Sequence, residues 1–242
     1  MKTKAWILLC MAATGWVACD LTDENPSLPI VEQVYEFEEG VEGWEGDFAD
    51  LPVEGQDIYD LEVAHAPLPD EIGSNSGSIK VQGNNRSDDL FMFLKTQISG
   101  LSPSTTYQIV FEIELASQYP SDAPGAGGSP GSSVYIKAGA TAEEPLPVVE
   151  ENAGVDYYRM NIDKGDQANE GADMINLGTV GIDSDEYRYE LITRDNHDRP
   201  FSATTDDEGN LWLIVGTDSG FEGLTILYYN QIKVRLEQVR TL

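Results

Sequence analysis

Residues 107–115 read YQIVFEIEL, and this segment decides the expected fold. Apolar side chains occupy every second position from Tyr107 to Leu115, and the acids Glu112 and Glu114 stand between them. Successive side chains of a β-strand point to opposite faces, so this alternation is typical of a strand with one buried face and one face toward water. The segment therefore predicts a central strand of a half-buried sheet.

The same alternation continues outward in both directions along the chain. We expect further strands at residues 33–38, 58–63, 90–98, 133–138, 187–193, 211–215 and 224–236. A Gly- and Pro-containing turn at residues 100–106 and a Gly-containing turn at residues 218–223 separate neighbouring strands and predict two β-hairpins. No stretch of ten or more residues shows a convincing helical period. The sequence thus predicts an all-β sandwich, formed as a single domain by residues 33–242.

The first 19 residues predict export and a lipid anchor. Lys2 and Lys4 precede the uncharged, largely apolar residues 5–18, which is the pattern of a secretory signal peptide. Residues 16–19 read WVAC and resemble the lipobox of bacterial lipoproteins, so we expect lipidation at Cys19 after removal of residues 1–18. An ordinary cleavable signal with an incidental cysteine is the alternative.

Residues 19–32 are acidic, contain two prolines and show no periodicity, so they predict a tether between lipid and domain. The acids after Cys19 resemble sorting signals of surface-exposed lipoproteins in Bacteroides-type bacteria. We expect a location in the cell envelope, lipid-anchored at the outer membrane or the cell surface.

The charge of the chain excludes one class of partner. There are 43 acidic and 14 basic residues, for a net charge of −29. Nucleic acid binding depends on Lys and Arg that displace counterions, so nucleic acid is excluded, and anionic membranes are disfavoured except through the lipid anchor. Divalent cations, neutral sugars and simple solubility remain compatible with this charge. Without a cysteine after Cys19, disulfides cannot staple the fold, and we expect a monomer held by its core.

Calcium is the expected metal, because it prefers six to eight oxygen ligands from carboxylates, amides and carbonyls. Asn161, Asp163, Asp166 and Asn169 place such oxygens close together in one polar loop, although their spacing differs from that of an EF-hand. Polar turns of an acidic protein are the alternative.

Ligand-binding candidates come from polar and aromatic side chains. The polar segment 84–89 contributes Asn84, Asn85 and Arg86. Trp44, Tyr157 and Tyr158 could offer rings on which a sugar packs, as binding sites combine apolar surface with a few placed polar groups. Core packing is the alternative for each ring.

Catalytic candidates are weak. Glu112 and Glu114 project from one face of the predicted strand, roughly 6 to 7 Å apart, which is near the separation used by inverting glycosidases. The solvated face of a half-buried strand explains them equally well. Residues 127–131 match G-x-S-x-G, but Pro130 lacks the N–H that an oxyanion hole needs after the serine.

Three segments resemble galactose-binding-like jelly rolls, notably bacterial carbohydrate-binding modules. They are residues 35–44 (YEFEEGVEGW), 100–107 (GLSPSTTY) and 228–234 (YYNQIKV). The resemblance implies a jelly-roll β-sandwich, and it implies a structural calcium near Glu38 and Asn230, where Asn230 replaces the acid usual in such modules. The whole chain also resembles uncharacterised secreted lipoproteins of Bacteroides-type bacteria.

These observations lead to one leading hypothesis and two alternatives. We expect a non-catalytic cell-surface lipoprotein that binds a glycan or a surface partner, supported by calcium. The first alternative is a glycoside hydrolase, or a related glycan-active enzyme, that uses paired carboxylates. The second is a structural or adhesive surface protein, which would present a flat apolar patch.

Overall fold

The computed structural model describes residues 28–73 and 76–240. The predicted signal peptide, Cys19 and most of the predicted tether lie outside these residues. Within the described part, no helix is long and apolar enough to cross a membrane.

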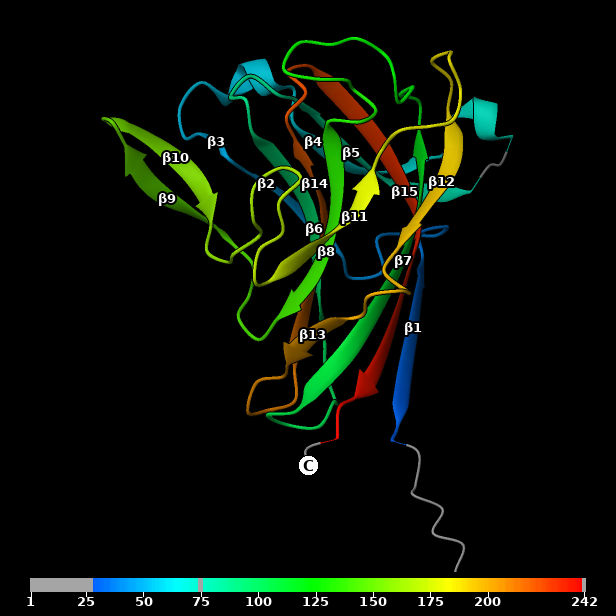
Figure 1. Cartoon of the computed structure of the whole chain (residues 1–242), viewed down its shortest axis with the longest axis vertical. Helices are drawn as coiled ribbons and strands as arrows, with labels where there is room; N and C mark the ends of the chain where they lie inside the picture. Colours follow the sequence, from blue (N-terminus) through cyan, green and yellow to red (C-terminus); the bar gives the residue numbers. More distant parts are fainter. Residues whose placement is uncertain (1–27, 74–75, 241–242) are drawn as a thin grey trace, which may run out of the picture.

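Short strands make up nearly all of the regular structure (Figure 1), together with the 3₁₀ helices Gln56–Tyr59 and Asp70–Ile72. The strands are β1 Ile30–Glu36, β2 Glu45–Ala49, β3 Leu51–Pro52, β4 Glu62–Pro67, β5 Gly77–Asn84, β6 Leu90–Ile98, β7 Thr106–Ser117, β8 Val134–Thr141, β9 Pro147–Asn152, β10 Val155–Met160, β11 Met174–Thr179, β12 Glu190–Asp195, β13 Phe201–Thr204, β14 Leu211–Ser219 and β15 Leu224–Gln238.

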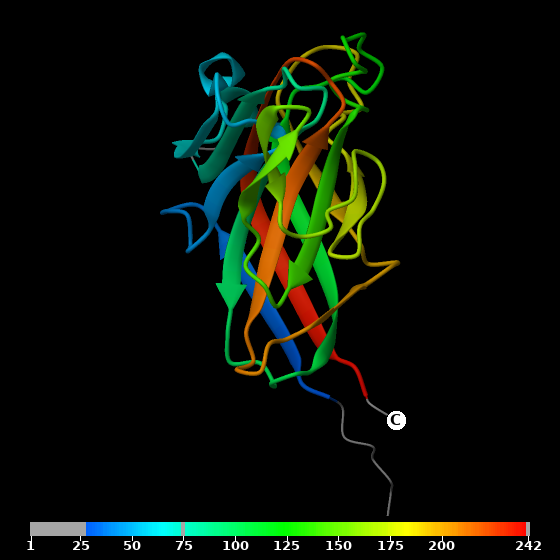
Figure 2. The same cartoon turned by 90° about the vertical axis from the view of Figure 1, so that its left-hand side faces the viewer.

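The strands form two packed sheets and one small sheet (Figures 1 and 2). The first sheet has the order β12-β7-β15-β5-β4, with β13 also on β7 and β1 on β15. The second sheet has the order β11-β8-β14-β6-β2, and the small sheet has the order β3-β10-β9. The orders β5-β15-β7-β12 and β6-β14-β8-β11 are those of a jelly roll, in which the chain passes repeatedly from one sheet to the other. The predicted all-β jelly-roll sandwich is confirmed.

The core lies between the two sheets and follows the alternation seen in the sequence. On β7, Ile109, Phe111, Ile113 and Leu115 are completely buried, as expected. Buried side chains from β5, β6, β8, β14 and β15 join them in one cluster. Burial of this apolar surface, at about 25 cal/mol per Å², is the main force that holds the sandwich together.

Both predicted hairpins are wrong. β6 lies in the second sheet between β2 and β14, whereas β7 lies in the first sheet between β15 and β12. β14 and β15 are likewise divided between the two sheets. The Gly- and Pro-containing segment 100–106 and the Gly-containing segment 218–223 therefore turn the chain from one sheet to the other, because the jelly-roll topology separates strands that follow each other in sequence.

Two strand boundaries also differ from expectation. The alternating residues 58–63 begin as the 3₁₀ helix Gln56–Tyr59, and β4 starts only at Glu62. Asp60 has φ 50° at the end of this helix, a backbone conformation that interrupts a strand. At the N-terminal side, β1 begins at Ile30 and pairs with β15, so the sandwich starts inside the predicted tether 19–32.

Residues 161–173, called here the covering loop, lie across the outer face of the second sheet. Ile162 from this loop packs with Phe91, Phe93, Ile214 and Met174 in a second, smaller cluster. β6 is therefore apolar on both faces: Leu90, Met92 and Leu94 enter the main core, while the two phenylalanines face the loop. Polar side chains on this outer face are therefore buried beneath the covering loop.

Candidate functional site

The candidate site begins with two charged side chains on neighbouring strands of the second sheet. Lys137 on β8 and Asp218 on β14 point to the outer face, because Ile136, Ala138 and Thr217 beside them are buried on the inner side. The covering loop leaves both side chains with no exposed surface. Charged residues this deeply buried are rare unless they are paired.

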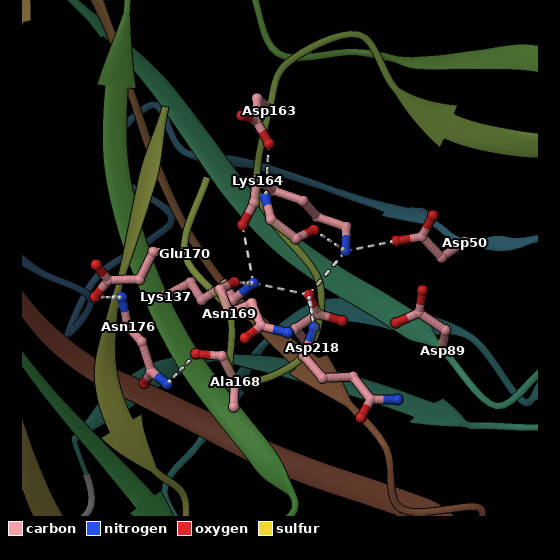
Figure 3. A network of polar contacts seen from close by, with 12 residues as sticks. Asp50, Asp89, Lys137, Asp163, Lys164, Ala168, Asn169, Glu170, Asn176 and Asp218 are labelled. Carbon is pink, nitrogen blue, oxygen red and sulfur yellow. Dashed lines mark hydrogen bonds and ion pairs between the residues drawn. The ribbon is translucent and has the colours of Figure 1, made fainter. Parts of the chain in front are cut away.

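Lys137 and Asp218 are fixed by several polar partners. Nζ of Lys137 donates hydrogen bonds to the backbone carbonyls of Lys164 (2.8 Å) and Asn169 (2.9 Å), and to Oδ2 of Asp218 (3.0 Å). The same Oδ2 atom accepts from Nζ of Lys164 (2.7 Å) and from the backbone N–H of Gln167 (3.0 Å). These bonds attach the covering loop to the sheet (Figure 3).

The network continues outward toward the small sheet. Nζ of Lys164 also lies 2.8 Å from Oδ2 of Asp50, which is in the connection between β2 and β3. Oδ1 of Asp50 accepts from Nη1 of Arg159 on β10 at 2.6 Å, and Asp89 lies 3.9 Å from the same nitrogen. We call these six residues the buried ionic network: Asp50, Asp89, Lys137, Arg159, Lys164 and Asp218.

Burial and neighbouring charges shift the pKa values of Asp89 and Asp218 in opposite directions. Burial raises the pKa of Asp89 to about 8, and its hydrogen bond with Asp218 and the charge of Asp218 add to this. Burial alone would raise the pKa of Asp218, but the charge of Lys164 and the hydrogen bond from Asp89 outweigh it and lower that pKa. At neutral pH, Asp89 is therefore protonated and Asp218 is ionised.

The two lysines are shifted in opposite directions. Burial lowers the pKa of Lys137 more than its contact with Asp218 raises it. For Lys164, burial is outweighed by the charges of Asp218, Asp50 and Asp89, so its pKa is raised. Lys164 is thus the fixed cation of the network, and Lys137 is the lysine that gives up its proton more readily.

An open pocket adjoins the network, called here the charged pocket, with a volume of about 410 Å³. It is lined by Asp50, Asp89, Glu150, Arg159, Met160, Ile162, Asp163, Lys164, Gly165 and Asp166. The guanidinium of Arg159 stacks over the ring of Tyr157 at 5.1 Å, and both residues share one face of β10. The pocket thus combines carboxylates, two cations and a neighbouring aromatic ring.

Three carboxylates of the network are close enough together to consider a metal. Ligand atoms of Asp50, Asp89 and Asp218 lie within 4.8 Å of one another, and they form the one such group within residues 28–73 and 76–240. However, the ammonium of Lys164 lies 2.7 Å from Asp218 and 2.8 Å from Asp50. The protein's own cation therefore already balances these acids, and a divalent ion would meet strong repulsion there.

The loop residues predicted to bind calcium are used by the loop itself. The carboxylate of Asp163 accepts from the backbone N–H groups of Gly165 (3.1 Å) and Ala172 (2.9 Å), and these bonds lower its pKa. The side chain of Asn161 bonds to backbone atoms of Leu146 and Glu144.

Asp166 and Asn169 pair through their backbones within the same loop. Calcium binding by this loop stays a prediction.

The predicted ligand-binding residues lie in several places. Trp44 is 3% exposed and packs against Tyr35 in the core, so it offers no binding surface, contrary to expectation. Asn85 is 1% exposed and donates to the carbonyls of Ser219 (2.8 Å) and Phe221 (3.0 Å), a bracing role between strands.

Asn84 is buried and donates to Asp60, whereas Arg86 is exposed. Tyr158 packs partly against the main core, and its neighbour Tyr157 lies on the opposite face of β10, beside the charged pocket. Tyr157 stacks on Arg159, which lines the charged pocket, whereas Tyr158 lines a separate pocket of about 220 Å³.

Glu38, which follows β1, and Asn230, which lies in β15, line the same small pocket. This pocket has a volume of about 150 Å³ and is also lined by Glu36, Ser76 and Gly77. Asn230 lies at a bulge of β15, and its Nδ2 donates to Glu114 at 2.6 Å, so its Oδ1 is the atom left to act as a ligand. Calcium binding at this pocket stays a prediction.

Glu112 and Glu114 face water on the first sheet rather than each other across a cleft. Glu112 accepts from Lys233 at 2.7 Å and lies 3.3 Å from Nε2 of His197, and these hydrogen bonds lower its pKa. A glycosidase pair needs one carboxyl that stays protonated, with a raised pKa. Glu112, whose pKa is lowered, is not such an acid.

The sequence analysis missed Lys137, Lys164, Asp50, Asp89 and Asp218, which build the candidate site. One signal was present: Lys137 interrupts the apolar segment 134–140 (VYIKAGA), where a charged residue is unexpected. Asp218 was assigned to a turn, although it belongs to β14.

Comparisons with known proteins add the following. No protein-family model and no curated protein matches this chain. Among solved structures, the chain is similar to the carbohydrate-binding module TmCBM61 in complex with β-1,4-galactotriose, with 10% identity and a TM-score of 0.35 over 82% of this chain and 89% of that one.

It is also similar to the C-terminal family 22 carbohydrate-binding module of Clostridium thermocellum Xyn10B, with 12% identity and a TM-score of 0.36 over 87% of this chain and 95% of that one. A third match is the enzymatically active domain of bacteriophage CBA120 tailspike protein 4, with 10% identity and a TM-score of 0.36 over 84% of this chain. This chain spans only 20% of that tailspike chain. With TM-scores below 0.5, these matches carry no argument about function.

Proposed function

We propose that this chain is a non-catalytic binding protein that holds a neutral glycan in the charged pocket beside β10. The observation that carries the proposal is the pocket itself: an open space of about 410 Å³ whose polar wall is fixed by ion pairs and which adjoins an aromatic ring. Such a combination of placed polar groups and ring surface is what a sugar requires.

The chemistry of the wall suits hydroxyl groups. A sugar hydroxyl both donates and accepts, and the wall offers the carboxylate of Asp50 and the protonated carboxyl of Asp89 beside the guanidinium of Arg159 and the ammonium of Lys164. Because Arg159 and Lys164 are already tied to Asp50 at 2.6 and 2.8 Å, little side-chain entropy is lost on binding.

The charge around the pocket selects against anions. Glu150, Asp163 and Asp166 line it in addition to the network acids. An anionic ligand would be repelled by these carboxylates, so a neutral polysaccharide is the expected class. The net charge of −29 has the same effect at longer range.

Tyr157→Ala is expected to lower glycan affinity at least about fivefold, since truncation of an aromatic contact residue that anchors a ligand costs more than about 1 kcal/mol. Affinity electrophoresis against a panel of neutral polysaccharides measures this as lost retardation. Tyr187→Ala is the matched control, because Tyr187 is an exposed tyrosine on a different segment. If wild-type protein is retarded by no polysaccharide of a broad panel, the proposal fails.

Attachment to the outer membrane or cell surface through a lipid on Cys19 belongs to the same proposal. It rests on residues 1–19 of the sequence. The thioether-linked lipid would appear as a mass gain on the N-terminal peptide, absent in Cys19→Ser.

Calcium is proposed for the pocket between Glu38 and Asn230, with Glu36 as a further carboxylate. We expect chelation to lower the melting temperature, because removal of an ion that binds only the folded state removes its contribution to stability. Differential scanning fluorimetry with calcium and then with excess EGTA measures this. Glu38→Gln should abolish the response, and equal melting temperatures in both buffers would rule out this ion.

One observation favours a second candidate, a structural or adhesive role. The hairpin of β9 and β10, which stands apart from the sandwich in Figure 1, exposes Val148, Val149 and Val155 to solvent. Exposed apolar side chains gathered on one element are a common feature of protein contact surfaces.

A further inference from the structure

The side chains of Lys137 and Asp218 lie side by side on two paired strands. In the register of β8 and β14, Lys137 lies opposite Gly216 and Asp218 lies opposite Tyr135, so the two side chains are diagonal neighbours on one face. Nζ of Lys137 and Oδ2 of Asp218 are 3.0 Å apart, and neither side chain has exposed surface. We propose that these two residues become joined by an amide bond between Nζ of Lys137 and Cγ of Asp218.

The nucleophile is held in the orientation that this reaction needs. Two of the three hydrogen-bond directions of Nζ are taken by the carbonyls of Lys164 and Asn169. When Lys137 is neutral, its two N–H groups point to these carbonyls and its lone pair points to the carboxyl of Asp218. Burial favours the neutral amine, since it lowers the pKa of Lys137.

The carboxyl group of Asp218 has two oxygens in different surroundings. Oδ2 accepts from the ammonium of Lys164 and the backbone N–H of Gln167, donors that stabilise the negative oxygen of a tetrahedral intermediate. Oδ1 is buried and accepts from no N–H group of the described residues. Carboxyl oxygens of Asp89 and Asp218 lie within 4.8 Å of each other, and the contact between the two side chains raises the pKa of Asp89 and lowers that of Asp218, so the proton of the pair resides on Asp89.

Asp89 is therefore placed to move protons in this step. Its raised pKa keeps it protonated at neutral pH, so it can give its proton to Oδ1, the oxygen that leaves. The amine attacks Cγ, the C–O bond to Oδ1 breaks, and Oδ1 departs as water. Overall, the ammonium of Lys137 loses two protons and the carboxylate of Asp218 loses one oxygen, and these atoms form the water. Asp89 gives up one proton and regains one, so it is unchanged at the end. No oxidant or other reactant is consumed.

The surroundings also protect the product. The covering loop leaves Lys137 and Asp218 without exposed surface, so water has little access to hydrolyse the amide. Conversion removes two buried charges, whose desolvation makes a buried ion pair a weak source of stability.

Peptide mass spectrometry of the denatured, trypsin-digested full chain tests the proposal. Trypsin cleaves after Lys137 only if its side chain is free. The linked product is expected as residues 96–159 joined to residues 195–233, at a mass one water lighter than the sum of the two peptides. Separate peptides ending at Lys137 and containing Asp218, with no linked species in wild-type protein, would overturn the proposal.

Two variants test the role of Asp89. Asp89→Asn keeps the shape of the side chain but removes its acidic proton, so the linkage should form on the order of 100-fold more slowly. Asp88→Asn is the control at an exposed neighbouring residue and should link as wild type does. Circular dichroism checks that both variants are folded. Equal linkage in Asp89→Asn and wild type would show that Asp89 takes no part.

Discussion

Replacement of Lys164 by methionine is expected to lower the free energy of unfolding by about 3 to 5 kcal/mol, because removal of one partner leaves buried charges uncompensated. Nζ of Lys164 lies 2.7 Å from Asp218 and 2.8 Å from Asp50, and the side chain of Lys164 is 7% exposed. Asp50 loses this cation whether Asp218 is a carboxylate or an amide. Urea denaturation measures the change as a lower midpoint.

Lys233→Met is the matched control for this prediction. Nζ of Lys233 lies at the same 2.7 Å from a carboxylate, that of Glu112, but the lysine side chain is 45% exposed. Exposed pairs contribute roughly 0 to 1 kcal/mol, so this variant should lie close to wild type. If both methionine variants are destabilised equally, burial of the network has no special role.

Stability is also expected to fall as the pH rises from about 4 to about 8, and Asp89 is the reason. Burial raises its pKa in the folded state from 3.8 to about 8. In this window the folded state holds a proton that the unfolded state has released, so stability decreases by up to about 1.4 kcal/mol per pH unit. Below pH 4 the contribution of Asp89 to stability is fully present, and above pH 8 it is lost.

The groups around Asp89 do not reverse this direction. Asp218 on β14 and Asp50 raise its pKa, and Lys164 on the covering loop lowers it less than burial raises it. Burial is the largest cause of the raised pKa of Asp89, and it does not depend on the charge of Asp218. Asp163, Glu170 and Asp206 have lowered pKa values, so their contributions are lost only at acidic pH, below this window.

Unfolding midpoints of wild type, Asp89→Asn and Asp88→Asn at pH 5 and pH 8 measure this effect. Asp89→Asn should show little dependence on pH between these two values. Asp88→Asn should follow wild type. A wild-type protein whose stability is the same at both values would contradict the assignment of a protonated Asp89.

The fold could be predicted from the sequence where one face of a strand is buried. β7 shows this well, because Ile109, Phe111 and Ile113 alternate with polar residues. The hairpins could not be predicted correctly, because a turn that joins two strands of one sheet uses the same glycines and prolines as a connection between sheets. A hairpin and a connection between sheets differ in the strand that pairs with β6. Here β6 pairs with β14, and the register places Ile98 opposite Leu211, 113 residues along the chain.

The candidate site was mostly beyond the reach of the sequence. Lys137 and Asp218 are 81 residues apart, and Asp50 and Arg159 are 109 apart. Apart from Lys137, which interrupts an apolar segment, each residue is ordinary in its own segment, and their chemistry arises from burial under the covering loop. The sequence offers Tyr157 and Tyr158 as aromatic candidates, Tyr157 contacts Arg159 of the charged pocket, and ligand binding by these rings stays a prediction.

The pairing of β1 with β15 bears on how the protein would resist mechanical force. The two strands run antiparallel from Ile30–Glu237 to Glu36–Gln231, and the described chain leaves both at the same end of the molecule (Figure 1). A pull on the chain ahead of Ile30 acts along β1, while the hydrogen bonds to β15 lie across it. All of them therefore share the load together, in shear, instead of opening one after another. A bound ligand dragged by flow would strain this strand pair in its strongest direction.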